Sequence, residues 1–107
     1  MMHVLKKLEE ISISGSEACR VRKMFEEKGM CFEYDVIMPH TRIPVEGYAI
    51  HEADEFCLFI KGQVIACNDG VEVLMKPGCV NFNPKGEPHW TKNDTDEECH
   101  IVTVMLK

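Results

Sequence analysis

Two histidines and one glutamate in the second half of the chain have the chemistry of a metal site. His51 and Glu55 are separated by three residues, and His89 follows after two turn-forming segments. Two imidazoles and one carboxylate suit Fe(II), Mn(II), Ni(II), Co(II) or Zn(II), and they leave coordination positions open for water or a substrate. A lone interior histidine is, however, more often a hydrogen-bonded core residue. The residue types alone leave both interpretations open.

The elements that must hold the first two of these residues are extended. Residues 48–52 and 55–61 read as strands, and side chains alternate between the two faces of a strand. If His51 faces an interior, Glu55 and Cys57 therefore face it too. An unpaired carboxylate is costly to bury, and a metal shared with the histidines would remove that cost.

A rigid hairpin positions the third residue, His89. Pro77 before Gly78 favours a type II turn, because glycine accepts a positive φ without steric cost. Residues 84–86, Pro-Lys-Gly, repeat this turn chemistry before the next strand. The run 78–93 follows the pattern G-x5-P-x-G-x2-H-x3-N at every position. It resembles the second sequence motif of the cupin family.

The first motif of the same family is present in part. The pattern H-x3-E-x6-G is matched by His51, Glu55 and Gly62. Two positions differ, because Ala49 stands where the family has its first histidine and Ile43 where it has its first glycine. The two motifs together span about half of the chain, and the second is the more specific.

The resemblance implies a small β-barrel, and in many cupins the motif histidines and glutamate bind a metal. Carried over residue by residue, this role falls to His51, Glu55 and His89. The family includes dioxygenases, isomerases, lyases and epimerases, so the resemblance implies a small organic molecule inside the barrel without naming the reaction. The alternative is a metal-free cupin that binds a sugar or another metabolite without catalysis, and the alanine at position 49 favours it.

Three more residues are candidates for the wall of such a pocket. Cys57 shares a strand face with Glu55. Tyr34 is expected to reach the pocket with its hydroxyl group. His100, on the last predicted strand, either lines the pocket or faces out.

The remaining pattern predicts an all-β fold, a small barrel of the cupin or jelly-roll type, in a single domain over residues 1–107. Many short segments of period 2 are separated by Gly, Pro and Asn turns, including a hairpin turn at 68–70. We expect residues 30–107 to form the barrel, and residues 1–29 to hold a strand and one short helix.

The predicted helix depends on apolar spacing in the N-terminal segment. Ala18, Val21, Met24 and Phe25 recur at helical intervals after serines that suit an N-cap. The pair at 28–29, Lys-Gly, then has the residue types that commonly end a helix.

A homodimer is predicted from the strand over residues 55–61. Its second face carries Phe56, Leu58 and Ile60, and keeping each such side chain from water is worth roughly 1.5–3 kcal/mol. A strand that is apolar on both faces needs a cover on both. We expect the sheet of a second copy, or the N-terminal segment, to supply it.

Composition excludes several partners. The net charge is −6, with 18 acidic and 12 basic residues, so nucleic acid and anionic membranes are not expected partners.

Residues 1–7 lack the features of a signal peptide, which predicts a cytoplasmic protein with reduced thiols. The six cysteines contain no C-x-x-C pair, and we expect them to be small apolar core residues rather than zinc ligands.

Overall fold

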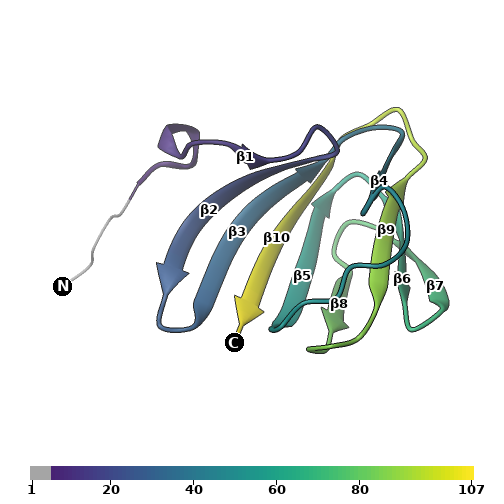
Figure 1. Cartoon of the computed structure of the whole chain (residues 1–107). Helices are drawn as coiled ribbons and strands as arrows, with labels where there is room; N and C mark the ends of the chain where they lie inside the picture. Colours follow the sequence, from purple (N-terminus) through teal and green to yellow (C-terminus); the bar gives the residue numbers. More distant parts are fainter. Residues whose placement is uncertain (1–5) are drawn as a thin grey trace.

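The computed structural model describes residues 6–107, which form two antiparallel β-sheets that face each other (Figure 1). The first five residues, most of the segment in which we looked for a signal peptide, lie outside this range. Within the described residues, no helix has the length and apolar character needed to cross a membrane.

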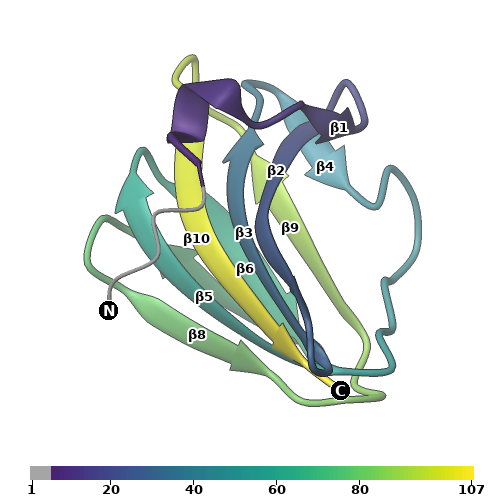
Figure 2. The same cartoon turned by 90° about the vertical axis from the view of Figure 1, so that its left-hand side faces the viewer.

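The larger sheet has six strands in the order β1-β2-β3-β10-β5-β8, and Figure 2 looks onto it with β8 at one edge. Its strands are β1 (Ser14–Gly15), β2 (Cys19–Glu27), β3 (Met30–Ile37), β10 (Cys99–Leu106), β5 (Asp54–Lys61) and β8 (Val80–Asn83). The smaller sheet has the order β4-β9-β6-β7. Its strands are β4 (Thr41–Ile43), β9 (His89–Asn93), β6 (Val64–Asn68) and β7 (Val71–Met75).

The hydrophobic core lies between the two sheets. The large sheet contributes Ile37, Cys57, Phe59, Cys99 and Ile101, and the small sheet contributes Val64, Ala66 and Met75. All six cysteines are free, and Cys57, Cys67 and Cys99 are buried. The expectation that cysteines act as small apolar core residues is confirmed for these three.

The all-β prediction is confirmed, whereas the predicted helix before residue 29 is wrong. That segment forms β2, which pairs with β3 through a two-residue turn at Lys28 and Gly29. Both turn residues have positive φ, 56° and 75°, as a type I′ hairpin requires. The only helical element of the described residues is a 3-10 turn, Leu8–Glu10.

A bulge lies within the segment whose apolar spacing predicted a helix. The register of β2 against β3 shifts between Lys23 and Phe25, so Met24 is an extra residue that interrupts the alternation of faces. Val21 pairs with Asp35 and Phe25 with Phe32, so the apolar residues before and after the bulge lie on opposite faces of the sheet and not on one stripe. The segment is a strand because it pairs with β3 along its whole length.

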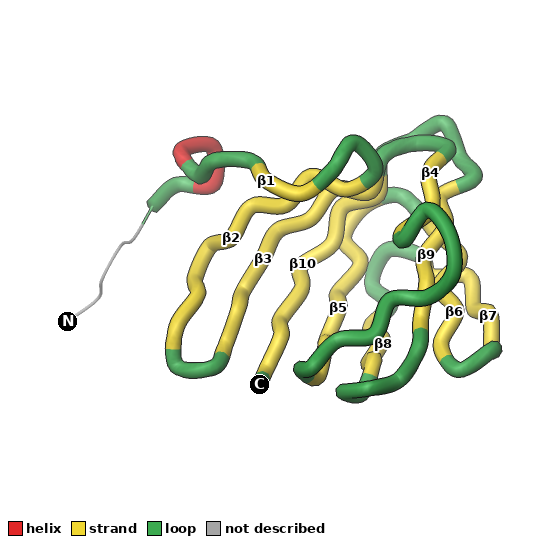
Figure 3. The backbone as a smooth tube through the Cα atoms, viewed as in Figure 1, coloured by secondary structure: helices red, strands yellow, loops and turns green. Residues whose placement is uncertain are grey.

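Two other predicted elements have different outcomes. The hairpin at residues 68–70 is present, since β6 and β7 join through Asp69 and Gly70, both with positive φ. The strand predicted over 48–52 is absent apart from a single bridge at Ala49. These residues belong to the long connection between β4 and β5, drawn as loop in Figure 3.

Candidate metal centre

Three different elements bring His51, Glu55 and His89 together at one end of the space between the sheets. His51 comes from the β4–β5 connection, Glu55 from β5 of the large sheet and His89 from β9 of the small sheet. Nε2 of His51 lies 3.7 Å from Oε2 of Glu55, and Nε2 of His89 lies 3.8 Å from Oε1. One ligand atom from each residue lies within 4.8 Å of the other two.

The hydrogen bond made by Nδ1 of His89 leaves the lone pair of Nε2 free to bind a cation. Nδ1 of the buried ring lies 3.1 Å from the carbonyl oxygen of Glu87. A carbonyl only accepts, so Nδ1 carries the proton and donates it, as in many metal-ligating histidines. In the neutral ring the lone pair of Nε2 then faces the carboxylate of Glu55. A cation between these two acceptors would be bound by both of them.

Two asparagines orient the carboxylate of Glu55. Asn83 is paired with Glu55 across β8 and β5, and its Nδ2 donates a hydrogen bond of 2.8 Å to Oε1. Asn68 donates in turn to Oδ1 of Asn83 at 2.6 Å. This chain fixes the rotamer of Glu55, and such outer partners of a metal ligand tune the affinity of a site.

His51 is the most exposed of the three ligand candidates. Its side chain is 37% exposed, compared with 14% for Glu55 and 9% for His89. Its carbonyl accepts a hydrogen bond of 3.0 Å from the backbone N–H of Gly86. The ring centroid lies 4.9 Å from that of His89. The Pro-Lys-Gly turn therefore holds the backbone of His51, while its ring stays at the surface.

The three residues fit a divalent transition metal. Bonds from such an ion to imidazole nitrogen or carboxylate oxygen are about 2.0–2.2 Å long, so two ligands of one ion are at most about 4.4 Å apart. Both histidine–carboxylate separations are below this limit. The overall spread of the three ligand atoms, 4.8 Å, is only slightly larger.

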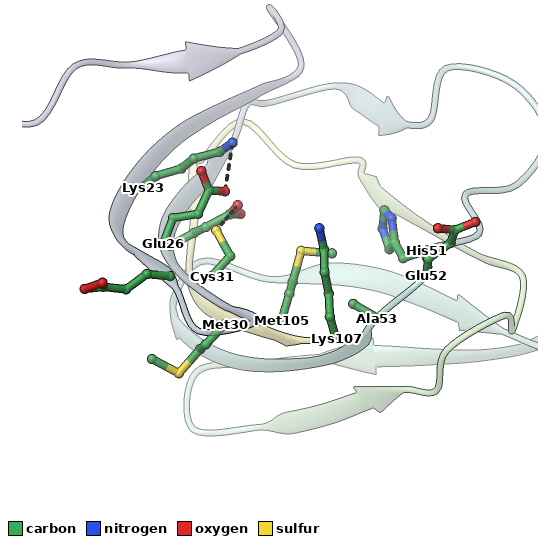
Figure 4. Close-up of a pocket in the computed structure, with 12 residues that line it drawn as sticks. Lys23, Glu26, Met30, Cys31, His51, Glu52, Ala53, Met105 and Lys107 are labelled. Atoms are coloured by element: carbon green, nitrogen blue, oxygen red, sulfur yellow. Dashed lines mark hydrogen bonds and ion pairs between the residues drawn. The ribbon is translucent and has the colours of Figure 1, made fainter.

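A cavity of about 170 Å³ extends from these residues between the sheets. Its wall includes Ala49, Cys57 and Asp35 besides the three ligand candidates. A second groove of about 400 Å³, shown in Figure 4, has a lining that includes the charged side chains of Lys23, Glu52 and Lys107. His51 borders both spaces.

The predicted pocket residues occupy different places. Cys57 is buried in the cavity wall, and its Sγ lies 3.7 Å from Oε1 of Glu55. Burial, together with the nearby Glu55 charge, raises the pKa of the Cys57 thiol far above its ordinary value. This residue is therefore a protonated thiol and not a nucleophile.

Tyr34 and His100 do not line the cavity. They contact each other instead, with the Tyr34 hydroxyl 2.6 Å from Nδ1 of His100. The neighbours Asp35 and Ile101 pair with each other and do line the cavity. Since side chains alternate along a strand, Tyr34 and His100 point to the outer face of the sheet.

Two residues that sequence reasoning did not select, Asn83 and Asp35, belong to this region. Asn83 stands just before Pro84 in the motif, and its polar type at an inward position of a strand was the available signal. Asp35 alternates with the aromatic residues of β3 and is buried. Burial, followed by the charge of Glu33, raises the pKa of Asp35 from 3.8 to about 8.

Comparison with known families agrees with this architecture. The family model described as "Cupin domain" matches residues 28–105. No curated protein sequence matches the chain.

Similar solved structures include the TT1209 protein of Thermus thermophilus, with a TM-score of 0.77, 21% identity and coverage of 95% of both chains. An ectoine synthase of P. lautus has a TM-score of 0.82 and 17% identity, over 97% of this chain and 78% of the other. A polyketide cyclase of Streptomyces resistomycificus has a TM-score of 0.82 and 16% identity, over 98% and 80%. At these identities the likeness shows the fold alone.

Proposed function

The chain belongs to the cupin family, and from this premise we propose that it binds a divalent transition metal (Fe, Mn, Ni, Co or Zn) through His51, Glu55 and His89. The bound metal takes part in binding or converting a small organic molecule in the cavity. The oxidoreductase, isomerase and lyase reactions of cupins all suit such an arrangement.

The arrangement of Glu55 and His89 is the observation that supports this proposal most strongly. The backbone carbonyl of Glu87 accepts a hydrogen bond from Nδ1 of His89, and Asn83 donates one that holds the carboxylate of Glu55 in place. The free lone pairs of both residues therefore converge, and a cation between them removes their repulsion.

When bound, the metal would supply a Lewis acid with open coordination positions. The chain itself supplies three other functions. Phe59, Ile37 and Ile101 give the cavity an apolar wall that limits water. Glu55 provides the one carboxylate among the three ligand candidates, and the exposed ring of His51 borders both the cavity and the groove.

A metal-free binding protein is the second candidate function, and Ala49 favours it. This residue occupies the place of a family histidine, so the site has three ligand candidates from the chain instead of four. In that case His51 and His89 would hydrogen-bond to a sugar or another metabolite in the cavity.

A second copy of the chain is the partner that we propose for the outer face of the large sheet. Phe56, Leu58 and Ile60 of β5 are 39%, 43% and 44% exposed. They continue on β8 with Val80 and Phe82, and the ring of Phe82 stacks on that of Phe56 at 4.8 Å. A contiguous apolar face of this kind marks an interaction site, and its apolar character suits a copy of itself in an isologous dimer.

A cytoplasmic location is part of the proposal, because six free cysteines suit a reducing compartment.

Elemental analysis of the tag-free protein tests the metal. The protein is incubated separately with Mn, Fe, Ni, Co and Zn salts and then desalted. We expect about one equivalent of one or more metals per chain, lost in the variant Glu55→Gln. If no metal is retained in stoichiometric amount, the metal-free binding function takes its place.

A further inference from the structure

Asp35 presents a buried polar atom that no protein group satisfies. The residue lies on β3, is 8% exposed and lines the same cavity as the metal ligand candidates. Its Oδ1 has no hydrogen-bond partner. Buried polar atoms nearly always have a partner, and Oδ1 of Asn81 in the wall of the same cavity is a second exception, so this cavity calls for a specific explanation.

In the described part of the chain, the groups around Asp35 include no cation with which its carboxylate could form an ion pair. Its neighbours on the inner face are Glu33 of the same strand, Cys19 of β2, Thr103 of β10, and Glu55 and Cys57 of β5. None of them is a cation, and no lysine or arginine lines the cavity within the described residues. Lys23, farther along β2, is paired with Glu26 at 3.4 Å.

A carboxyl group in such surroundings keeps its proton. Burial and two nearby carboxylates penalise the charged form of Asp35. A neutral carboxyl is a hydrogen-bond donor as well as an acceptor. The cavity therefore has a buried donor on β3 and, two strands away across the sheet, the ligand candidate Glu55 on β5.

We propose that Asp35 binds the ligand of this cavity, donating a hydrogen bond from its neutral carboxyl group to an oxygen atom of a small carboxylate such as a hydroxy acid. This inference rests on the proposed function, because the remaining oxygens of the ligand would face His51, Glu55 and His89. It adds the class of ligand and the residue that selects it.

Charge and volume support a small anion. A divalent ion with Glu55 as its one anionic ligand from the chain leaves a net positive charge, which favours a negatively charged ligand. The cavity volume of about 170 Å³ equals about six water molecules at ~30 Å³ each. A ligand with about half a dozen non-hydrogen atoms fills it. Ile37, Phe59 and Ile101 leave room for a short apolar part.

Two substitutions of Asp35 separate hydrogen bonding from structure. Asp35→Asn keeps a donor of the same shape without a charge, and Asp35→Leu removes the donor. Each protein is first loaded with Mn(II), and its metal content is measured. Glycolate and malonate are then titrated by calorimetry, with methyl glycolate as the uncharged control and Asp94→Leu as an exposed control variant.

We expect equal metal content in all variants. Wild type and Asp35→Asn should bind glycolate or malonate with affinities within about threefold of each other. Asp35→Leu should bind at least about tenfold more weakly, the loss expected when a hydrogen bond to a charged group is removed. Methyl glycolate should bind none of the proteins well. Thermal melts should show that both variants fold.

Three results would overturn the inference in distinguishable ways. A wild-type chain that retains no metal contradicts the proposed function, and the inference falls with it. A metal-loaded wild type that binds neither acid contradicts the ligand class alone. Equal binding by wild type and Asp35→Leu contradicts the role of Asp35 while leaving metal and ligand intact.

Discussion

Ala49 and His89 are held face to face by two backbone hydrogen bonds between the β4–β5 connection and β9. The N–H of Ala49 donates to the carbonyl of His89 at 2.8 Å, and the N–H of His89 donates back at 3.0 Å. Side chains of residues paired in this way lie on the same side of the sheet, and both residues line the cavity. The methyl group of Ala49 thus occupies the place from which a third imidazole would reach the metal centre.

Restoring that imidazole should strengthen metal binding. We expect Ala49→His to lower the dissociation constant for Mn(II) or Zn(II) at least about tenfold, an effect no smaller than that of losing an outer-shell partner. Calorimetric titration at pH 7.5 measures it. Protons compete with metals for imidazole nitrogen, so both proteins should bind more weakly at pH 5.5. Unchanged affinity at both pH values would contradict the ligand assignment.

Removing His89 should abolish metal binding without unfolding the chain. The ring lies at the cavity wall, outside the cluster of apolar core residues, so His89→Ala should keep the far-ultraviolet circular dichroism of the wild type. Metal content after desalting should fall to the background level. His40→Ala is the control, since His40 pairs only with the exposed Asp96 among the described residues, and it should retain full metal content. Retention of metal by His89→Ala would show that the ion binds elsewhere.

Loss of the hydrogen bond from Asn83 to Glu55 should weaken metal binding. Asn83→Ala frees the carboxylate to rotate, and we expect the affinity to fall by about 10- to 100-fold, the usual effect of losing an outer-shell partner. Asn81→Ala on the same strand is the control, because Asn81 also lines the cavity whereas it is Asn83 that donates to Glu55. Equal losses in both variants would mean that the strand, and not the hydrogen bond, is responsible.

The raised pKa of Asp35 should make the free energy of unfolding depend on pH. Between its ordinary value of 3.8 and the folded value of about 8, the folded chain holds a proton that the unfolded chain has lost. The free energy of unfolding therefore falls as pH rises through this window, by at most about 1.4 kcal/mol per pH unit from this group. Urea denaturation of metal-free wild type and Asp35→Asn at several pH values isolates the effect. The slope of the variant should be flatter by this amount, and identical slopes would place the proton elsewhere.

The apolar outer face of β5 and β8 should hold two copies of the chain together. A charge at its centre, as in Leu58→Lys, would have to be buried without a partner, so we expect this variant to be monomeric in sedimentation velocity and light scattering at micromolar concentration. Val73→Lys, at a 52% exposed position on β7 of the other sheet, should remain a dimer. A monomeric wild type would leave the exposed face without the proposed partner.

Local alternation was enough to place part of the site. Along β5 it put Glu55, Cys57 and Phe59 on one face, and all three line the cavity. The turn residues around Gly86 likewise placed His89 at the start of a strand. These features depend on contacts between near neighbours in the sequence, so the sequence pattern predicts them.

Other features depend on pairing between distant segments. Which face of β3 points inward is decided by its register with β10, about 65 residues later, and the face that carries Tyr34 is the outer one. Tyr34, which was expected to reach the pocket, therefore points away from it, and Asp35 lines the cavity instead. The bulge at Met24 is fixed in the same way, and the hydrogen bond between Asn83 and Glu55 joins strands that are distant in sequence.

The unequal exposure of the three metal ligand candidates has a kinetic consequence. Glu55 and His89 are fixed by strands and hydrogen bonds, whereas the ring of His51 stands at the surface on a loop. An ion would arrive and depart by swinging this one ring aside, with the other two ligands still in place. Stiffening the loop would lengthen the residence time of the ion with little change in ligand geometry. Exchange of one metal for another at this site would then depend on the motion of this one side chain.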